Sequence, residues 1–553
     1  MGDVIPQLGK EPLDLVVLGG GLAGLTLALQ VRRARPETRI LVLEKGSHPV
    51  PEAAFKVGES SVELGAHYFA KVLGLEAHIA QDHLPKLGLR FFFKGARADD
   101  SGSRLTTGLE VGADRFFPTP SYQLDRGRLE NHLAAQLRET GVFFLDSAKV
   151  NEVALGEAGD LHRVSFTREA SHRSVSARWV VDASGRASLL KRRLNLAEEI
   201  PHKVNAVWFR IKDLPPLDQW CPAWSAEAGA EGRRWLSTNH LMGSGYWVWV
   251  IPLSSGSTSV GIVADPRIHL LSDMNRFERA LDWLSRHEPD CAAVVARHRE
   301  DLQDFLVLRH FSYGCKRVFS ADRWALTGEA GIFLDPFYSP GSDFIAVSNT
   351  FVADLILKDL NGKRIAGSAN IYEQLYLSYF KNTLAVYRDQ YPLFGNPHIM
   401  PIKIYWDYAV YWTLFAFVFV QGRLTQLGLY ALIQDRFLQA GDLNNRMQAF
   451  FREWHRHDCP EVPHAFLNQA EIPLMHRLNE GLSEPLDDEA FVVRFEENVS
   501  ILMQLAEQIV AWAVERVPEL GAHWETPETS EGRSVESEGT QEVYLAEAFA
   551  ALR

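Results

Sequence analysis

The stretch LDLVVLGGGLAGLTLALQVRRARPETRILVLEKG (Leu13–Gly46) decides the fold. It predicts a buried strand, a glycine-rich turn, a helix and a second strand. Gly19, Gly21 and Gly24 have the GxGxxG spacing that permits a tight turn and a close approach of the backbone to a pyrophosphate at the helix N-terminus. Glu44 ends the second strand, where its carboxylate can accept hydrogen bonds from ribose hydroxyls. Together these features predict a dinucleotide-binding α/β domain.

Length, charge and cysteine content limit the class of protein. A chain of 553 residues is long enough for two or three domains with sizeable cores. The formal net charge of −13 argues against a nucleic-acid-binding surface, because phosphate recognition needs a basic footprint. The four cysteines form no CxxC pair, which indicates a reducing compartment, without a disulfide framework or a structural zinc site. We therefore expect a cytoplasmic location.

Two segments invite other interpretations. His455, His457 and Cys459 in HRHDC are metal-ligand residue types, but they lack a second ligand cluster, so we predict a surface helix end and no metal site. The most apolar run, YAVYWTLFAFVFV (Tyr408–Val420), is shorter than the roughly 18 to 20 residues that span a bilayer. It predicts a buried helix, or one that touches a lipid-like ligand or a membrane surface. The opening MGDVIPQLGKEPLD has no apolar core, so no signal peptide is expected.

Two later motifs bear on which nucleotide binds. WVVDASGRAS (Trp179–Ser188) resembles the strand-end motif of FAD-dependent monooxygenases. LTGEAGIFLDPFYSPGSDF (Leu326–Phe344) resembles their second flavin motif, with Glu329 in place of the usual aspartate. Each motif taken alone is also a common turn sequence. All three nucleotide motifs in this order favour FAD over NAD.

The stretch GYWVWVIPLSSGSTSVGIV (Gly245–Val263) predicts a β-hairpin with Trp247 and Trp249 on one face of its first strand. Taken alone, the pattern is that of an ordinary core strand. With KVGESS (Lys56–Ser61) and the lysine of LPKLGLRFFF, Lys86, it resembles the flavin-dependent halogenases, a branch of the FAD monooxygenase-like proteins. The resemblance is closer to the phenol and pyrrole type than to the tryptophan type. It covers roughly residues 13–350 and weakens beyond them.

The resemblance implies a set of cofactor-binding residues and an order of events. The residues expected to bind FAD are Gly19, Gly21, Gly24, Glu44, Lys56, Val57, Gly58, Glu59, Ser60, Arg126, Asp182, Gly328, Glu329, Asp335 and Gly341. Reduced FAD, O2 and halide give hypohalous acid, which travels to Lys86. The lysine then holds the acid by hydrogen bonding, or as a haloamine, and delivers an electrophilic halogen.

The residues that the resemblance places in catalysis are Lys86, Trp247, Trp249 and Tyr338. The two tryptophans are expected to separate the flavin from the substrate. Lys86 needs a dry, enclosed setting in which its protonation can be tuned. The competing interpretation of Lys86 is a solvated loop lysine, which is what most lysines are.

The sequence departs from the family pattern after Asp335-Pro336. Tyr338 stands where tryptophan halogenases have a glutamate that helps the lysine. The halide site of the family corresponds to Ser339, Pro340 and Gly341, and a proline has no N–H to offer a halide. Halide binding by this loop is therefore in doubt even if Lys86 is in place.

The predicted fold is α/β: a Rossmann-like FAD-binding domain with an inserted antiparallel β-sheet substrate domain and a mainly helical C-terminal region. The expected boundaries are 1–200 and 316–370 for the FAD-binding domain, with 50–130 contributing to the active site, 201–315 for the antiparallel sheet, 371–524 for the helical region and 525–553 for a mobile acidic tail.

Three functions remain open on the sequence. The first is an FAD-dependent halogenase that acts on an electron-rich aromatic, pyrrole or otherwise activated substrate, free or carrier-bound, in secondary metabolism. The second is a hydroxylase or epoxidase on the same frame without halide use. The third is a flavoprotein that docks a membrane lipid or an acyl carrier through Tyr408–Val420. No second nucleotide fingerprint is visible, so reduced flavin is expected from a separate reductase. The aromatic residues of 405–419 form either one wall of a substrate cavity or a plain core helix.

Overall fold

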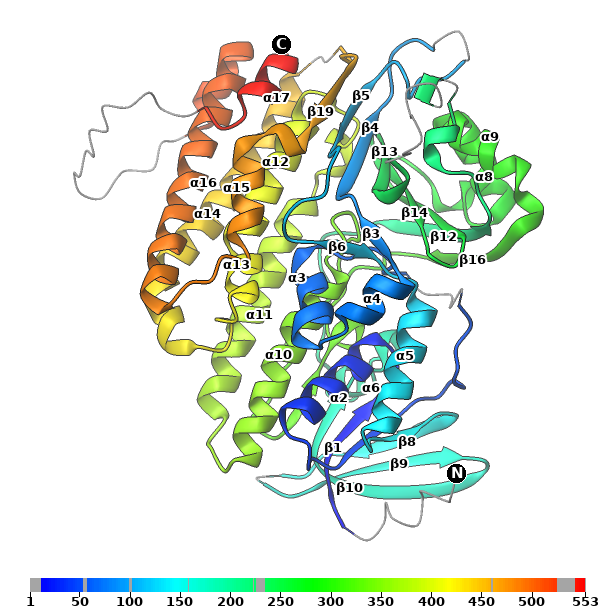
Figure 1. Cartoon of the computed structure of the whole chain (residues 1–553), viewed down its shortest axis with the longest axis vertical. Coiled ribbons are helices and arrows are strands. Elements are labelled where there is room, and N and C mark those ends of the chain that lie inside the picture. The colour runs from blue at the N-terminus through cyan, green and yellow to red at the C-terminus, as the bar shows by residue number, and fades with distance from the viewer. Residues whose placement is uncertain are drawn as a thin grey trace.

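The computed structural model places three structural parts side by side (Figure 1). A seven-stranded sheet lies at the N-terminal end, an eight-stranded sheet lies above it, and the C-terminal helices run along both. The described residues are 11–52, 57–98, 102–157, 159–221, 223–224, 234–458, 461–524 and 543–552. The acidic segment expected at 525–541 therefore lies outside the described residues, and so do Lys56 and Cys459.

The seven-stranded sheet is the predicted nucleotide-binding sheet. Its strand order is β7-β2-β1-β10-β9-β8, with β18 paired to the end of β10. The strands are β1 (Leu13–Leu18), β2 (Ile40–Leu43), β7 (Phe143–Leu145), β8 (Ala148–Ala154), β9 (His162–Arg168), β10 (Ser171–Asp182) and β18 (Trp324–Leu326). Strands β1, β2, β7, β10 and β18 pair in parallel. Helices α2 (Leu22–Ala34), α5 (Arg126–Glu139) and α10 (Gly341–Leu360) pack together beside this sheet.

The eight-stranded sheet contains more than the expected insertion. Its order is β16-β12-β15-β14-β13-β4-β5-β19. The strands are β4 (Leu89–Phe93), β5 (Leu109–Gly112), β12 (Asn205–Lys212), β13 (Thr238–Gly243), β14 (Tyr246–Pro252), β15 (Ser257–Ala264), β16 (Leu302–Leu308) and β19 (Ala465–Asn468). The strands from 205–308 pair antiparallel, as predicted, but β13 pairs with β4 and β5 pairs with β19 in parallel. Every residue of β13 is buried, so this strand needs a neighbour on each side, and β4 supplies the second one.

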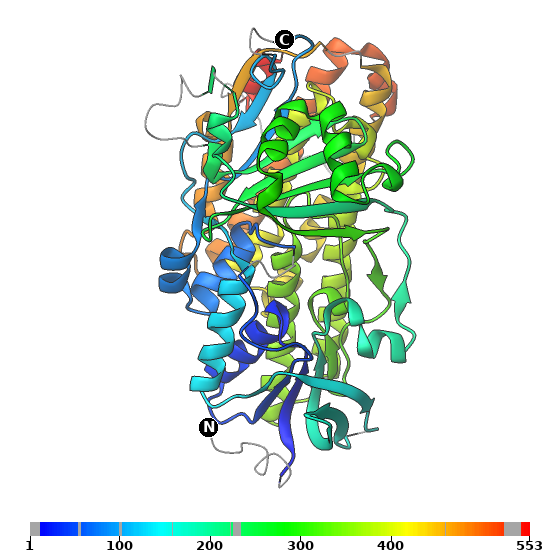
Figure 2. The same ribbon diagram turned by 90° about the vertical axis from the view of Figure 1, so that its right-hand side faces the viewer.

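The two faces of the hairpin strand β14 belong to different cores. Trp247 and Trp249 join the main core, which is continuous with the nucleotide-binding domain. Val248 and Val250 join a second core. That second core lies under helices α8 (Phe277–His287) and α9 (Pro289–Arg297), on the outer side of the sheet in Figure 2. The predicted alternation therefore directs the tryptophans toward the interior of the molecule.

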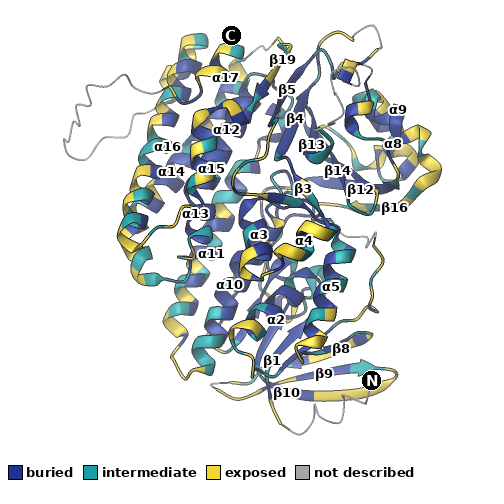
Figure 3. Cartoon of the chain, viewed as in Figure 1, coloured by how far each residue is buried: buried dark blue, intermediate teal, exposed yellow. Residues whose placement is uncertain are grey.

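The C-terminal region is helical, as predicted. Its helices are α11 (Ala366–Tyr387), α12 (Ile399–Thr413), α13 (Phe415–Val420), α14 (Leu427–His457), α15 (Pro473–Gly481), α16 (Asp488–Arg516) and α17 (Ala546–Ala551). Helix α12 contacts α14, α15 and α16 and is buried along nearly its whole length, whereas α14 and α16 expose one face (Figure 3). Within the described ranges, no helix is both long and apolar enough to cross a membrane.

Short elements connect these parts. They are α3 (Glu63–His67), α4 (Glu76–Asp82), β3 (Leu84–Lys86), β6 (Ser121–Gln123), α6 (Leu189–Arg193), β11 (Ala197–Glu198) and β17 (Gly314–Cys315). Strand β3 pairs with β6, which places the segment that ends in Lys86 between the two large sheets. Cys221, Cys291 and Cys315 are buried.

Candidate active site

A large cavity begins at the glycine turn and ends at the tryptophan strand. It encloses about 650 Å³ and is called the cofactor cavity below. A Cβ atom added to Gly21 would meet nothing within 4 Å, whereas one added to Gly24 would lie 2.0 Å from the carbonyl oxygen of Gly19. Gly21 therefore leaves open space beside the start of α2, and Gly24 lets the helix pack on the turn. This arrangement fits a pyrophosphate group at the helix N-terminus.

Most of the residues predicted to bind FAD line the cofactor cavity. They are Gly19, Gly21, Glu44, Val57, Gly58, Glu59, Ser60, Arg126, Gly328, Glu329 and Gly341. Trp247, Trp249, Ser339 and Pro340 line the same cavity. The Glu44 carboxylate accepts hydrogen bonds of 2.7 Å from the N–H groups of Gly20 and Gly46. A long cavity with an acid and an open turn at one end and aromatic rings at the other fits the adenosine and isoalloxazine ends of FAD.

Three predicted cofactor residues lie outside the lining. Gly24 packs against the turn, as described above. The Asp182 carboxylate accepts hydrogen bonds from the N–H groups of Ser184 (2.9 Å) and Leu190 (2.7 Å), and so fixes the loop that forms part of the cavity wall. Burial raises the pKa of Asp182. Asp335 is fully buried and accepts hydrogen bonds from Tyr391 and His202.

A buried ion cluster supports the loop at Glu59, and the sequence analysis missed it. Arg210 on β12 donates to Glu59 Oε1 at 2.7 Å and also pairs with Asp304 on β16. All three side chains are at most 2% exposed. The sequence does contain one signal for this cluster, which is an arginine in the mostly apolar strand at 205–212. A buried charge needs a partner of opposite charge, so such an arginine predicts a buried acid nearby.

The two tryptophans of β14 are fixed by hydrogen bonds and ring contacts. The Trp247 indole N–H donates to the Tyr391 hydroxyl at 3.0 Å, and the Trp249 indole N–H donates to Ser259 Oγ at 3.0 Å. The Trp249 ring also covers Gly261, where an added Cβ atom would lie 2.1 Å from it. Tyr391 in turn donates to Asp335. Asp335 therefore acts on the tryptophan wall through Tyr391, a connection that the sequence did not reveal.

Lys86 is buried at the boundary of the cofactor cavity. Its side chain is 3% exposed, and Nζ donates to Ser60 Oγ at 2.8 Å and to the Ser61 carbonyl at 2.6 Å. Ser60 Oγ also lies 2.9 Å from Ser339 Oγ. Burial lowers the pKa of Lys86 to about 7, against the raising effect of the Glu63 and Asp343 carboxylates. The alternative of a solvated loop lysine does not describe this side chain.

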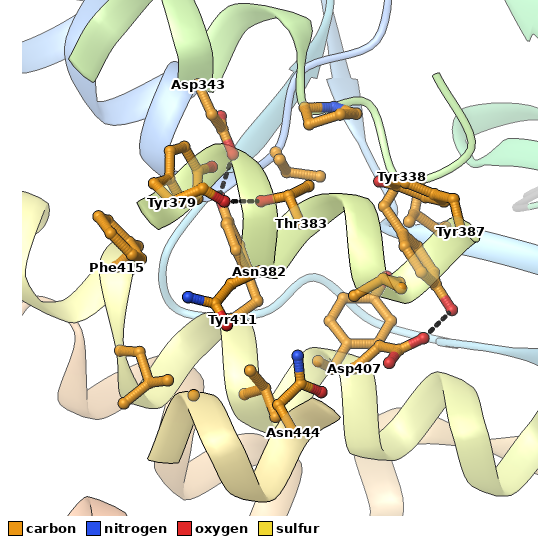
Figure 4. Close-up of a pocket in the computed structure, with 18 of the residues that line it drawn as sticks. Tyr338, Asp343, Tyr379, Asn382, Thr383, Tyr387, Asp407, Tyr411, Phe415 and Asn444 are labelled. Carbon is orange, nitrogen blue, oxygen red and sulfur yellow. Dashed lines mark hydrogen bonds between the residues drawn. The ribbon is translucent and has the colours of Figure 1, made fainter. Parts of the chain in front are cut away.

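A second cavity, the aromatic cavity, is lined mainly by residues of the helical region (Figure 4). It encloses about 100 Å³, of the same order as an engineered 150 Å³ cavity that binds benzene. Its aromatic lining consists of Tyr338, Tyr379, Tyr387, Tyr408, Tyr411, Phe415 and Phe437. Its polar lining consists of Asp343, Asn382, Thr383, Asp407 and Asn444. The segment at 405–419 therefore supplies part of a cavity wall, while Trp412 packs on Phe117 as a core side chain.

A thin partition separates the two cavities. Ser60 lines the cofactor cavity, Val62 lines the aromatic cavity, and Pro340 lines both. Lys86 donates to Ser60 and to Ser61, which stands between Ser60 and Val62. The lysine amine thus contacts the partition, although Lys86 itself is not among the residues that line either cavity.

Tyr338 lines the end of the aromatic cavity where Asp407 lies. Its hydroxyl donates to Asp407 Oδ2 at 2.8 Å (Figure 4). Asp407 also accepts hydrogen bonds from Lys403 (2.5 Å) and from Gln448 Nε2 (2.7 Å). Burial raises the pKa of Tyr338 well above its usual range, so this hydroxyl stays protonated.

The loop predicted to bind halide has few free donors. The Ser339 N–H donates to the Pro336 carbonyl at 2.8 Å, and Pro340 has no N–H. Helix α10 begins at Gly341, whose N–H and that of Ser342 have no partner within the helix because they belong to its first turn. Both residues line the cofactor cavity.

The histidines of the HRHDC segment lie at the end of α14, where a helix end was expected. His457 Nε2 lies 3.2 Å and His523 Nε2 lies 3.8 Å from Glu453 Oε1. The three ligand atoms lie within 4.8 Å of one another on an accessible surface. No local sequence pattern links His523 to the other two residues, because it lies more than 60 residues beyond His457 in the chain.

Comparison with known proteins supports the assignment of the cofactor cavity to FAD. A family model described as an FAD binding domain matches residues 13–267. Flavin-dependent halogenase chlA of Dictyostelium discoideum is 24% identical over 441 residues, 72% of this chain and 70% of that protein. The 1H-pyrrole-2-carbonyl-(peptidyl-carrier protein) chlorinase of Pseudomonas fluorescens is 26% identical, over 68% of this chain and 82% of that protein.

A crystal structure of halogenase PltM in complex with phloroglucinol and FAD has the same fold, with a TM-score of 0.61 and 17% identity over 92% of this chain and 96% of that chain. The helical C-terminal region, where the sequence resemblance weakened, is thus included in the structural match. The glycine turn, the matching FAD binding domain and the halogenase relatives all indicate a protein that binds FAD. The chain is therefore similar in sequence to the flavin-dependent halogenases and in fold to halogenase PltM, and it is an FAD-dependent oxidoreductase.

Proposed function

We propose that the protein uses reduced FAD, O2 and halide to halogenate a small, electron-rich substrate held in the aromatic cavity. Bound FAD supplies the oxidising chemistry that turns halide into hypohalous acid. The observation that carries the proposal is the position of Lys86, whose buried amine donates to Ser60 and Ser61 in the segment between the two cavities.

Lys86 is proposed to receive the hypohalous acid and to present the halogen to the substrate. Its pKa of about 7 leaves much of the amine neutral near pH 7, so the nitrogen keeps the lone pair that accepts a halogen. Ser60 and the Ser61 carbonyl hold the nitrogen at a fixed position. The reaction of the amine with hypohalous acid would give a haloamine and water.

Trp247 and Trp249 are proposed to keep the substrate away from FAD. Both line the cofactor cavity, and both indole rings are fixed by hydrogen bonds to neighbouring side chains. A substrate in the aromatic cavity would then meet the oxidant only through Lys86. This arrangement favours halogenation over direct hydroxylation.

The substrate class follows from the size and lining of the aromatic cavity. About 100 Å³ admits roughly one small ring, and the tyrosine and phenylalanine walls favour an aromatic ring over a charged group. The curated relative from Pseudomonas fluorescens is named for a carrier-bound pyrrole, and the PltM structure contains phloroglucinol. We propose a one-ring phenol or pyrrole, free or carrier-bound, with reduced FAD from a separate reductase.

The apolar run 408–420 supports contact with a substrate more than contact with a membrane. Tyr408 and Phe415 line the aromatic cavity, and Phe417 stacks on Phe491 at 5.2 Å. These side chains are buried within the helical region, so they do not form an exposed apolar patch for a membrane or an acyl carrier.

A hydroxylase or epoxidase remains the second candidate function because of Pro340. The Ser339 N–H is already bonded and Pro340 has none, so only the first turn of α10 offers N–H groups to a halide here. If halide does bind here, we propose that the N–H groups of Gly341 and Ser342 are its donors. If it does not, the protein would be an oxygenating flavoprotein with the same fold.

One product analysis separates the two candidates. The protein is supplied with FAD, a reductase, O2, bromide and a one-ring phenol or pyrrole, and the products are examined by mass spectrometry. A product with the paired isotope pattern of bromine supports halogenation. An oxygenated product that forms equally well without bromide supports the second candidate.

A further inference from the structure

We infer that Asp343 is the proton acceptor of the halogenation, taking the proton that the substrate ring loses when halogen replaces hydrogen. This inference rests on the proposed function. It assigns a role to a carboxylate of α10 that the sequence analysis did not single out.

Asp343 lies in the wall of the aromatic cavity with its carboxylate fixed (Figure 4). Oδ1 accepts a hydrogen bond from the Gly65 N–H at 2.9 Å, and Oδ2 accepts one from the Tyr411 hydroxyl at 2.9 Å. The residue is 1% exposed. A carboxylate oxygen can accept more than one hydrogen bond, so both oxygens keep a lone pair for the cavity.

The charges around Asp343 suit a base. Burial raises its pKa to about 8, the Tyr411 and Gly65 hydrogen bonds lower it, Glu63 raises it and Lys86 lowers it. The groups that face it are thus Lys86, Glu63, Tyr411 and, from α11, Tyr379. A carboxylate with a pKa near the working pH is a stronger proton acceptor than an ordinary aspartate and still releases the proton afterwards.

The other carboxylates near the cavity are less suited to this role. Asp407 lies at the opposite end and already accepts hydrogen bonds from Lys403, Tyr338 and Gln448. Glu63 is buried beside Lys86 but is not part of the cavity wall as the described residues define it. Asp343 is the carboxylate that both faces the cavity and interacts with Lys86.

The step balances with groups already named. The substrate ring attacks the halogen of the Lys86 haloamine while the nitrogen takes a proton from the water that formed with the haloamine, so a carbon–halogen bond forms and the N–X electron pair leaves with the neutral amine. The ring C–H bond then breaks, its electron pair returns to the ring, and Asp343 holds the proton. Return of that proton to the hydroxide restores water and resets both groups. The net reaction is ArH + HOX → ArX + H2O.

The test compares the parent protein with Asp343→Asn in the FAD-loaded enzyme with bromide, using resorcinol and ring-deuterated resorcinol as probes. Asparagine keeps the shape and can still bond to Gly65 and Tyr411, but it cannot take the proton. We expect the brominated product to fall roughly 100-fold or more, which is the usual contribution of a general base. FAD uptake, bromide-dependent O2 consumption and thermal stability at pH 8 should stay unchanged. Asp265→Asn, in a buried aspartate paired with Arg267 away from both cavities, is the matched control.

The isotope effect distinguishes a proton acceptor from a merely structural residue. Deuterated resorcinol should react at nearly the parent rate in the parent protein and at least twofold more slowly than resorcinol in Asp343→Asn, because proton removal becomes limiting. Turnover within threefold of the parent overturns the inference. A loss of turnover with no isotope effect, or with lost FAD or stability, overturns it as well. If the parent itself gives no brominated resorcinol, the proposed function fails first and this inference fails with it.

Discussion

Replacing Lys86 with alanine should stop halogenation without stopping the flavin chemistry. Within the described part of the chain, Lys86 donates to Ser60 Oγ and to the Ser61 carbonyl, and a shorter side chain leaves the cofactor cavity lined by the same residues. Lys86→Ala should therefore bind FAD and consume O2 like the parent. It should give no halogenated product, because no amine remains to carry the halogen to the aromatic cavity.

The size of the effect follows from the setting of the amine. With a pKa of about 7, roughly three-quarters of the Lys86 amine is neutral at pH 7.5, whereas an exposed lysine is neutral about once in 1,000 molecules. Burial thus favours the reactive form roughly several hundredfold over that of an exposed lysine. Lys86→Ala removes this amine altogether, so we expect its halogenated product to fall below detection. The activity of the parent should rise with pH through about pH 7 to 8, as the Lys86 amine and then the Asp343 carboxyl lose their protons, and level off above that. Lys86→Arg should fail too, since a guanidinium stays protonated.

The assay measures oxygen uptake and product mass together, with Lys358→Ala as a control because that lysine pairs with Asp354 away from both cavities. Halogenated product from Lys86→Ala at more than a tenth of the parent level would refute the reasoning. Oxygenated product that persists without Lys86 and without halide would instead identify a hydroxylase. An activity that rises only near pH 10 would show that the lysine behaves as an exposed one.

Three further changes test other parts of the site. Gly24→Ala should abolish FAD absorbance in the purified protein, because its Cβ atom would lie 2.0 Å from the Gly19 carbonyl oxygen; normal FAD content would contradict the proposed turn. Arg210→Met should lower the free energy of unfolding by about 3 to 5 kcal/mol in a urea titration, since it leaves two buried carboxylates unpaired; an unchanged midpoint would show that the pairs contribute little. Pro340→Thr should lower the bromide concentration needed for half-maximal rate about tenfold, because a hydrogen bond to an ion is worth about 1.5 to 3 kcal/mol; no change would mean that halide binds elsewhere.

The nucleotide-binding domain could be predicted from the sequence because its signals are local. The GxGxxG turn and the acid at Glu44 stand within one strand–helix–strand unit, and each residue type has one physical reason to be there. The hairpin at β14 could also be predicted, because the alternation of its side chains fixes which of them share a face of the sheet. The alternation does not specify which hydrophobic core each face joins, because this depends on which helices cover each face of the sheet.

The parts that the sequence did not reveal depend on contacts between distant segments. Strand β19 at 465–468 joins a sheet whose other members end at residue 308, and no local pattern specifies such a partner. Asp343 looked like an ordinary residue in the first turn of a helix until Gly65 and Tyr411 were placed beside it. Pairs of this kind are fixed by tertiary packing, so a single sequence carries little information about them.

The ion cluster of Glu59, Arg210 and Asp304 has a consequence for the exchange of the cofactor. It ties the loop after residue 57 to two strands of the eight-stranded sheet through side chains that are at most 2% exposed. Hinged separation of the two sheets would pull these charges apart inside the protein, which is strongly unfavourable. A flavin that is reduced elsewhere should therefore enter and leave while the Glu59 loop stays joined to these strands, and the rate of exchange should not depend on their separation.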